Sequence, residues 1–341
     1  MNKEIEKDII NCSRCGLCMD VCPVYKSKKT ETSLLRGKFL QLLGLIKGDL
    51  KYDRKIAYNL DLCLACKKCK NACPSGIDAV SIFAFVRNNN ETFFEHIFYS
   101  APFFKLKMLA LKIFYKIKYP IGRKKINPSF GGEKIGYFKG CATRAIGLGF
   151  NKKNDGFSCC ALPFYIKGRF DLYEKYKKRN IEQIKKFDKV VFDCATCFDT
   201  VSNYEGVEKE KLIYFTDFYK NKKMKSKNKL AVTFHKPCHL ENEKFKEIEE
   251  ILNSIENIEY IKMEKADDCC GFGGDFFTRH IKTATDLSVQ KAENAIKTGA
   301  DIILTTCPTC LWSLKFGIKA KKANLKAYDL AYFLDSLDNV D

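Results

Sequence analysis

Eighteen cysteines follow two duplicated patterns along this 341-residue chain, and no cysteine lies outside them. The first pattern, C-x2-C-x2-C-x3-C-P, occurs at 12–23 and again at 63–74. The second pattern has a lone cysteine, an adjacent pair and a C-x2-C group, and it also occurs twice. Its members are Cys141, Cys159, Cys160, Cys194 and Cys197 in the first copy, and Cys238, Cys269, Cys270, Cys307 and Cys310 in the second. In a disulfide scaffold we would not expect every cysteine to belong to one of two duplicated patterns.

Metal binding is the better explanation of this cysteine content. The first ten residues, MNKEIEKDII, are charged throughout and lack the apolar stretch of a secretory signal. The sequence therefore predicts a cytoplasmic location, where thiols stay reduced. In such a chain repeated cysteine groups indicate metal ligands rather than disulfides.

The two C-x2-C-x2-C-x3-C-P motifs predict two [4Fe–4S] clusters. Three thiolates at this spacing surround one face of a cubane, and the fourth, which precedes the proline, ligates the other cluster. This crossed scheme assigns Cys12, Cys15, Cys18 and Cys73 to one cluster, and Cys63, Cys66, Cys69 and Cys22 to the second. A zinc ribbon would use C-x2-C pairs rather than triplets. Residues 34–48, between the motifs, have helical apolar spacing, so a mainly helical module is expected over 1–90.

An aromatic, lysine-rich segment at 91–133 follows the module, and we expect it to be a helical linker. Lysines interrupt every apolar run long enough to span a bilayer. Two interpretations stay open, contact with a membrane surface and packing on a partner or on the second half of the chain. The net charge of +19 suits anionic partners, but it also fits a background rich in lysine and asparagine. A zinc-stabilised protein that binds nucleic acid is therefore a minor alternative, and we expect no nucleic-acid partner.

The second half has the pattern of parallel α/β units. Short β-rich runs lead into cysteines at 134–141, 189–197, 229–238 and 300–310, with helical stretches such as 169–187 and 278–299 between them. Ligands of such sheets gather at the carboxyl ends of the strands, so the five thiols of each copy should converge. We expect a shortened first cysteine-rich domain at 134–220, a charged linker at 221–229 and a second domain at 230–341.

The two copies differ in length. Thirty residues separate Cys238 from Cys269, enough for a helix near 243–254 and a strand near 258–263. Only 17 residues separate Cys141 from Cys159, too few for both elements. The predicted fold is therefore α+β / α/β, a helical two-cluster ferredoxin-like module followed by two duplicated α/β cysteine-rich domains, of which the first lacks a helix–strand segment.

These motifs resemble the family that contains the D subunit of heterodisulfide reductase, the glycolate oxidase iron–sulfur subunit and the anaerobic glycerol-3-phosphate dehydrogenase iron–sulfur subunit. The stretch from LLRGKFLQLL to CPSGID resembles the glycolate oxidase subunit, whereas the complete C-x2-C group in both copies resembles the other members. HKPCHL at 235–240 and CCGFGG at 269–274 are typical of the family.

The resemblance implies a noncubane [4Fe–4S] cluster on Cys238, Cys269, Cys270, Cys307 and Cys310, and a second cluster or a zinc ion on the first set. His235 and His239 flank Cys238, and we expect them to tune a cluster rather than to ligate it. The resemblance also implies an electron-transfer subunit that passes electrons from a separate FAD-dependent dehydrogenase of a glycolate- or lactate-type 2-hydroxy acid to a quinone or another acceptor. The alternative is a thiol–disulfide reductase in which the second set is the catalytic centre. No nucleotide-binding glycine motif follows a strand, which is why a partner flavoprotein is expected.

Overall fold

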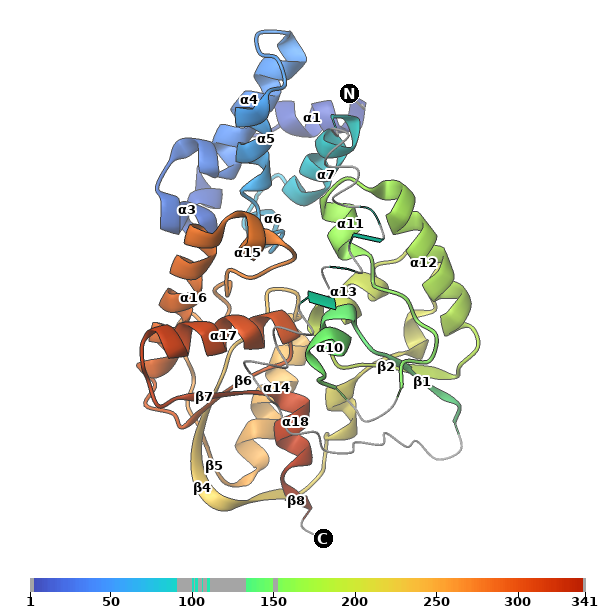
Figure 1. The fold of residues 1–341 in the computed structure, drawn as a ribbon, viewed down its shortest axis with the longest axis vertical. Helices are drawn as coiled ribbons and strands as arrows, with labels where there is room; N and C mark the ends of the chain where they lie inside the picture. Colours follow the sequence, from blue (N-terminus) through green and yellow to red (C-terminus); the bar gives the residue numbers. More distant parts are fainter. Residues whose placement is uncertain are drawn as a thin grey trace.

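The computed structural model describes residues 3–90, 133–149 and 153–339, with isolated positions at 100, 102–103, 106 and 109–110. Most of the aromatic segment at 91–133 therefore lies outside the described residues. Figure 1 shows the N-terminal module at the top, the first cysteine-rich domain at the right and the second at the lower left.

The N-terminal module is helical, as the sequence predicts. Its helices are α1 (Lys3–Ile10), α2 (Leu17–Val21), α3 (Pro23–Lys28), α4 (Leu35–Lys47), α5 (Arg54–Asp61), α6 (Lys68–Asn71) and α7 (Ala79–Asn89), with a 3-10 turn at Glu31–Ser33. Phe39 and Leu42 of α4 pack with Leu60 of α5 and Phe83 of α7 in one apolar core. The short helices α2 and α6 contact each other, which brings the two cysteine motifs together.

The first cysteine-rich domain has a parallel sheet of three strands in the order β1-β2-β3. The strands are β1 (Ile135–Phe138), β2 (Lys189–Phe192) and β3 (Leu212–Tyr214). Its helices are α10 (Cys141–Ile146), α11 (Leu162–Ile166), α12 (Phe170–Ile184) and α13 (Ala195–Ser202), with 3-10 turns at Lys209–Lys211 and Phe215–Phe218.

The second cysteine-rich domain has parallel strands in the order β5-β4-β6-β7, and β8 pairs antiparallel with β4. The strands are β4 (Met224–Phe234), β5 (Glu256–Tyr260), β6 (Ile302–Thr305), β7 (Lys326–Asp329) and β8 (Asp338–Asn339). The helices are α14 (Asn242–Ser254), α15 (Phe276–Arg279), α16 (Ile281–Ile296), α17 (Pro308–Ala320) and α18 (Leu330–Asp335). The expected helix–strand pair is thus α14 and β5, and it has no counterpart among the described residues of the first domain.

The charged run at 221–229 is not simply a linker, and that expectation was wrong. Strand β4 begins at Met224 and includes most of the run. Met224 and Ser226 are buried, and Met224 and Lys225 pair with the C-terminal strand β8. The polar composition conceals this strand because an edge partner from the far end of the chain supplies its hydrogen bonds.

The two cysteine-rich domains share one apolar core. Phe192 of the first sheet and Phe234 and Leu304 of the second belong to a single continuous cluster of buried side chains. The domains therefore pack as one body, and the carboxyl ends of both sheets lie toward the same central region (Figure 1).

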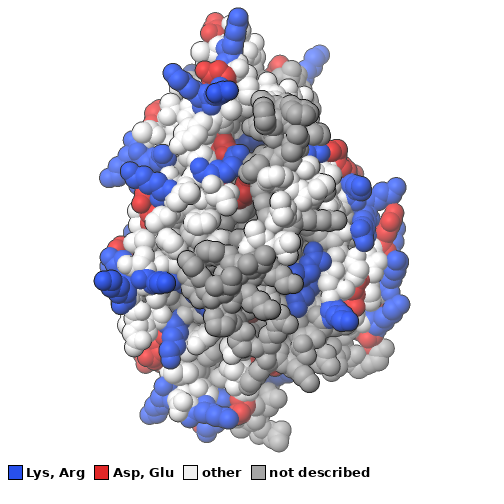
Figure 2. All heavy atoms as spheres, in the orientation of Figure 1, with Lys and Arg blue, Asp and Glu red and all other residues white. Residues whose placement is uncertain are grey.

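Basic side chains do not gather over one element on the face shown in Figure 2. They are spread around its periphery and interspersed with acids. None of the described helices combines the length and the apolar character needed to span a bilayer.

Candidate metal centres

The two ferredoxin-type loops have the same backbone conformation. Arg14 and Gly16 flank Cys15, and Ala65 and Lys67 flank Cys66, and all four have positive φ between 51° and 86°. Three of the four are not glycine, so each bears a cost of about 1–2 kcal/mol in this left-handed region. The two loops therefore share left-handed positions on both sides of their second cysteine, although Cys15 is exposed and Cys66 is half-buried.

The fourth cysteine of the first motif lies beside the second motif. Burial raises the pKa of Cys69 to about 12, and the neighbouring thiols of Cys63 and Cys22 add to that rise. Burial also raises the pKa of Cys22. Buried thiols with high pKa values favour a bound cation over the free thiolate, because the cation compensates the buried charge. The donor set therefore fits iron. Cys22 also raises the pKa of Cys18 in its own motif, so it lies close to both motifs, and the crossed assignment stays a prediction.

A buried lysine lies next to these thiols. Lys38 of α4 is only 3% exposed, and its ammonium donates to the carbonyl oxygen of Leu62 at 2.5 Å. Burial lowers the pKa of Lys38, while the thiols of Cys63, Cys22 and Cys69 oppose this shift. The sequence analysis did not single out Lys38, because nothing local distinguishes it from the other lysines.

The second cysteine-rich site brings its five thiols together at the ends of β4 and β6. Cys270 and Cys310 have sulfur atoms 3.3 Å apart. A hydrogen bond from Cys269 lowers the pKa of Cys238, which places these two side by side. Cys307 caps the N-terminus of α17, where the helix dipole favours a thiolate.

The first cysteine-rich site is assembled in the same way despite its missing segment. The sulfur atoms of Cys141 and Cys159 are 3.6 Å apart. Hydrogen bonds from Cys159 and then Cys197 lower the pKa of Cys160 well below its ordinary value. Cys194 caps the N-terminus of α13, as Cys307 caps α17 in the second copy. Both predicted sets of five thiols are therefore gathered.

The residue after each adjacent cysteine pair has the same conformation in both copies. Ala161 has φ 61° and Gly271 has φ 84°. Each donates its N–H to the first cysteine of its pair, at 3.4 Å to Cys159 and 3.5 Å to Cys269. The first copy thus keeps a glycine-like turn without its glycine.

The two cysteine-rich sites touch each other, which the sequence analysis did not foresee. A hydrogen bond from the Cys194 thiol lowers the pKa of Cys307 well below its ordinary value. Alongside, the N–H of Ala195 donates to the carbonyl oxygen of Thr306 at 3.3 Å. The first cysteines of the two C-x2-C groups therefore face each other between the domains.

The second ferredoxin-type motif lies against the second cysteine-rich site. Burial raises the pKa of Cys66 well above its ordinary value, and the Cys238 thiol is the largest charged contributor to this rise. Cys22 and Cys66 also pack against the buried cluster that contains Cys269 and Cys270. Ligands of one predicted cubane and of the second cysteine-rich site are therefore neighbours.

A mainly apolar cavity of about 600 Å³ lies where the three domains meet. Thiols of both cysteine-rich sites line it, together with Leu64, Phe272 and Trp312. The described residues Phe103 and Ala110 of the aromatic segment also reach it. The cavity is large enough for a small organic molecule.

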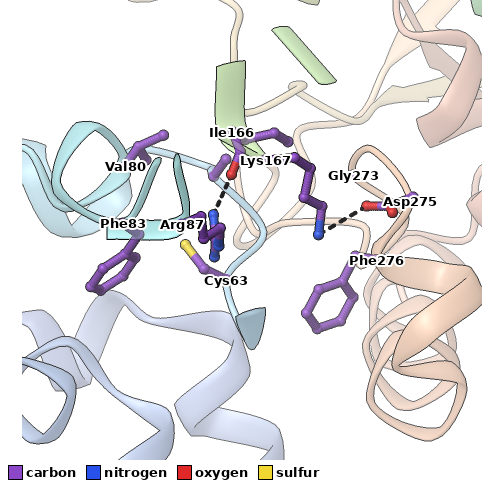
Figure 3. Close-up of a pocket in the computed structure, with 10 residues that line it drawn as sticks. Cys63, Val80, Phe83, Arg87, Ile166, Lys167, Gly273, Asp275 and Phe276 are labelled. Carbon is purple, nitrogen blue, oxygen red and sulfur yellow. Dashed lines mark hydrogen bonds and ion pairs between the residues drawn. The ribbon is translucent and has the colours of Figure 1, made fainter. Parts of the chain in front are cut away.

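Buried charges join the module to both cysteine-rich domains. Lys167 donates to Asp61 at 2.6 Å and pairs with Asp275 at 3.3 Å, and His280 lies 2.8 Å from the same Asp61. Figure 3 shows Lys167 and Arg87 extending into the region beside Cys63. Arg87 hydrogen-bonds the carbonyl oxygens of Leu60 and Ile166. Burial lowers the pKa of Lys167 to about 8.

The two histidines beside Cys238 have different surroundings. His235 is completely buried, and its Nδ1 lies 3.2 Å from the carbonyl oxygen of Ala266. His239 Nδ1 lies 2.6 Å from Asp199 of the first domain. Among the described residues, only His235 forms, with Cys270 and Cys310, a three-ligand group compact enough to hold one ion.

Comparison with known proteins agrees with this architecture. The 4Fe-4S dicluster domain matches residues 8–77, and the cysteine-rich domain called CCG matches 135–202 and 232–315. The B subunit of the fumarate reductase (CoM/CoB) of Methanothermobacter marburgensis is 28% identical, over 96% of this chain and 72% of its own length. The probable glycolate oxidase iron–sulfur subunit of Bacillus subtilis is 23% identical, over 96% and 94%. The D subunit of the dihydromethanophenazine:CoB–CoM heterodisulfide reductase of Methanosarcina acetivorans is 24% identical, over 95% and 92%.

Proposed function

This chain joins a 4Fe-4S dicluster domain to two cysteine-rich CCG domains, and from that premise we propose that it is the iron–sulfur subunit that accepts electrons from a separate FAD-dependent dehydrogenase. Its relatives are subunits of oxidoreductases, and an iron–sulfur electron-transfer role follows for the chain. The proposed donor oxidises a small 2-hydroxy acid of the glycolate or lactate type, and the proposed acceptor is a quinone or another carrier.

The proximity of Cys66 and Cys238 carries the proposal. Bound iron–sulfur clusters would supply one-electron chemistry. The proposed electron path runs from the first ferredoxin-type motif to the second and on to the second cysteine-rich site. Cys22 lies beside the second motif, and Cys66 of that motif lies beside Cys238. Apolar side chains such as Leu64 and Phe272 pack around Cys66 and Cys269 at this contact.

The finer assignments are also proposals. Cys12, Cys15, Cys18 and Cys73 would hold one cubane, and Cys63, Cys66, Cys69 and Cys22 the other. The second cysteine-rich set would hold a noncubane cluster, and the first set another cluster or zinc. Iron, zinc and sulfide analysis of anaerobically isolated protein tests these contents, and iron at trace level would contradict them.

The function is tested by isolating the tagged chain anaerobically with the flavoprotein that accompanies it and adding glycolate or lactate. We expect the visible absorption of the clusters to bleach and a reduced signal to appear at the cysteine-rich site. In Cys66→Ser the cubane assigned to Cys12, Cys15, Cys18 and Cys73 should still be reduced, whereas the second cysteine-rich site should not. Ser75→Ala, an exposed change beside the second motif, is the matched control. Clusters that no 2-hydroxy acid reduces, or the lack of any flavoprotein partner, would contradict the proposal.

The cavity between the two cysteine-rich sites favours a second candidate, thiol–disulfide reduction by this chain. Thiols from both copies line about 600 Å³ of mainly apolar space, which a disulfide substrate could enter. A paramagnetic signal that appears only when oxidised protein meets a thiol would support this function. The absence of any such signal with every thiol and disulfide tested would count against this function.

Membrane attachment remains a separate proposal for the segment at 91–133. Flotation of the complex with vesicles that contain anionic lipid tests it, and binding should weaken as salt rises. An equal amount of the complex in the floated fraction with and without vesicles would contradict membrane attachment.

A further inference from the structure

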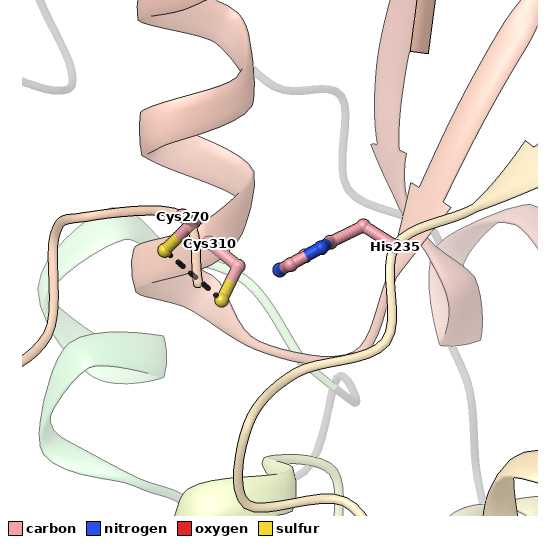
Figure 4. A group of neighbouring side chains, drawn as sticks. All are labelled: His235, Cys270 and Cys310. Atoms are coloured by element: carbon pink, nitrogen blue, oxygen red, sulfur yellow. Dashed lines mark hydrogen bonds between the residues drawn. The ribbon is translucent and has the colours of Figure 1, made fainter. Parts of the chain in front are cut away.

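We propose that His235 is a metal ligand of the second cysteine-rich site, through its Nε2 atom and beside Cys270 and Cys310. This inference rests on the proposed function only in that the site holds iron. Figure 4 shows the imidazole directed from the end of β4 toward the two sulfur atoms. The three side chains are buried, and their ligand atoms all lie within 4.8 Å of one another.

The tautomer of His235 is determined by its surroundings. Nδ1 lies 3.2 Å from the carbonyl oxygen of Ala266, and a carbonyl oxygen only accepts hydrogen bonds. Nδ1 therefore carries the proton, and the neutral imidazole keeps a bare lone pair on Nε2. The ammonium of Lys291 donates to the same carbonyl oxygen at 2.9 Å, which fixes the position of that oxygen.

Nε2 makes no hydrogen bond of ordinary geometry among the described residues although it is buried. Burial lowers the pKa of His235, and its polar neighbour, the Cys270 thiol, opposes this shift. An unsatisfied buried acceptor costs about 1–3 kcal/mol. A metal ion would use this lone pair and remove the cost. Metal-bound histidines commonly donate their other N–H to a backbone carbonyl, which is the arrangement of Nδ1 and Ala266.

The spacing of the sulfurs also fits one ion. Two metal–sulfur bonds of about 2.3 Å at the tetrahedral angle place the sulfur atoms roughly 3.8 Å apart. The sulfur atoms of Cys270 and Cys310 are 3.3 Å apart, so they would separate by about 0.5 Å to bind one ion. Their thiols come from the adjacent cysteine pair and from α17, and both are held by buried backbone.

The first copy has no equivalent of this nitrogen. Phe138 precedes Cys141 by three residues, as His235 precedes Cys238. The Phe138 ring stacks on Phe192 with centroids 4.8 Å apart and offers no ligand atom. Among the described residues, the structure therefore assigns an imidazole nitrogen to the second site alone, which makes the two duplicated sites chemically different.

Histidine labelling with 15N tests the proposal in the intact, anaerobically isolated protein. The sample is poised at a potential at which the second site is paramagnetic, and pulsed EPR measures nitrogen coupling. We expect a 14N coupling in unlabelled protein that changes to a 15N coupling on labelling. His235→Phe, which copies the first domain, should lose the coupling, whereas His239→Gln should keep it.

Three results would overturn the proposal. The first is a signal from the second cysteine-rich site without histidine nitrogen coupling in the unmodified protein, which needs no variant to fold. The second is a coupling that persists in His235→Phe once cubane iron content shows that this variant is folded. Both are distinct from failure of the proposed function, which is judged by reduction of the cubanes from the flavoprotein. The third is a second cysteine-rich site that contains no iron, which would contradict the proposed cluster at that site as well.

Discussion

His239 Nδ1 lies 2.6 Å from Oδ2 of Asp199, and this contact joins the two cysteine-rich domains. Lys67 of the N-terminal module donates to the same carboxylate oxygen at 2.7 Å. Burial alone would raise the pKa of Asp199, but its bonds and charge interactions with His239 and Lys67 hold it below its ordinary value. One carboxylate therefore connects all three domains next to the metal centres.

Replacing this carboxylate should loosen the domain junction. Asp199→Asn removes a charge that is buried with His239, and breaking such a pair should cost about 2–3 kcal/mol after allowance for the partly exposed Lys67. Thermal unfolding and limited proteolysis of the anaerobic protein measure the effect. Glu174→Gln, which removes an exposed helical ion pair, is the control and should change stability by less than about 0.5 kcal/mol. An unfolding midpoint equal to that of the control would contradict the role of Asp199.

Paired serine substitutions distinguish crossed from uncrossed cubane ligation. In the crossed scheme Cys12 and Cys73 serve one cluster, so the double variant Cys12→Ser/Cys73→Ser should retain the other cubane, about four iron atoms. Cys12→Ser/Cys22→Ser should lose both. Uncrossed ligation predicts the reverse, that Cys12→Ser/Cys73→Ser loses both cubanes and Cys12→Ser/Cys22→Ser retains one. Iron analysis and EPR of the reduced proteins measure the outcome.

The buried ammonium of Lys38 should raise the reduction potential of the neighbouring cubane. Lys38→Met removes a positive charge among Cys22, Cys63 and Cys69, so the reduced cluster becomes less stable. We expect the potential to fall by roughly 100 mV, because a unit charge at this range contributes about 2–3 kcal/mol at an effective dielectric constant near 20. A redox titration followed by EPR measures the shift. Lys47→Met, at the exposed end of the same helix, should leave the potential unchanged.

The equivalent turns after the cysteine pairs should respond oppositely to exchange of alanine and glycine. Ala161→Gly relieves a left-handed alanine and should stabilise the fold by about 0.5–1 kcal/mol. Gly271→Ala should destabilise it by more than about 2 kcal/mol, since the new Cβ would lie 2.7 Å from Leu287 and 2.8 Å from the Ala284 carbonyl oxygen. The thermal unfolding midpoints of the two variants are compared with that of the unmodified protein. Shifts of the same sign would contradict the equivalence of the two turns.

Lys291 should make stability depend on pH above neutrality. Burial lowers its pKa to about 8, although nearby acids oppose the shift. Between that value and the ordinary lysine pKa the unfolded chain binds more protons, so stability rises with pH there, by up to about 1.4 kcal/mol per pH unit. Lys291→Met should lose this part of the rise, which lies between about pH 8 and 10.5. Lys297→Met, an exposed change beyond the end of the same helix, should keep it, and equal slopes in all three proteins would contradict the prediction.

Much of the fold could be predicted because its signals are local. Helix 34–48 appears as α4, helix 169–187 as α12 and helix 243–254 as α14. The strand expected near 258–263 lies slightly earlier, as β5. In contrast, the N-terminal half of β4 was taken for a linker because its partner, β8, comes from the far end of the chain.

The sequence by itself predicted that the five thiols of each cysteine-rich copy converge, because its β-rich runs lead directly into cysteines and the carboxyl ends of parallel strands meet at one edge. Tertiary structure alone decided that Cys66 meets Cys238, that Cys194 meets Cys307 and that the His235 imidazole is directed toward two sulfurs. These contacts join residues far apart in the chain, and they depend on how apolar surfaces pack across domains. No short stretch of residues specifies that packing.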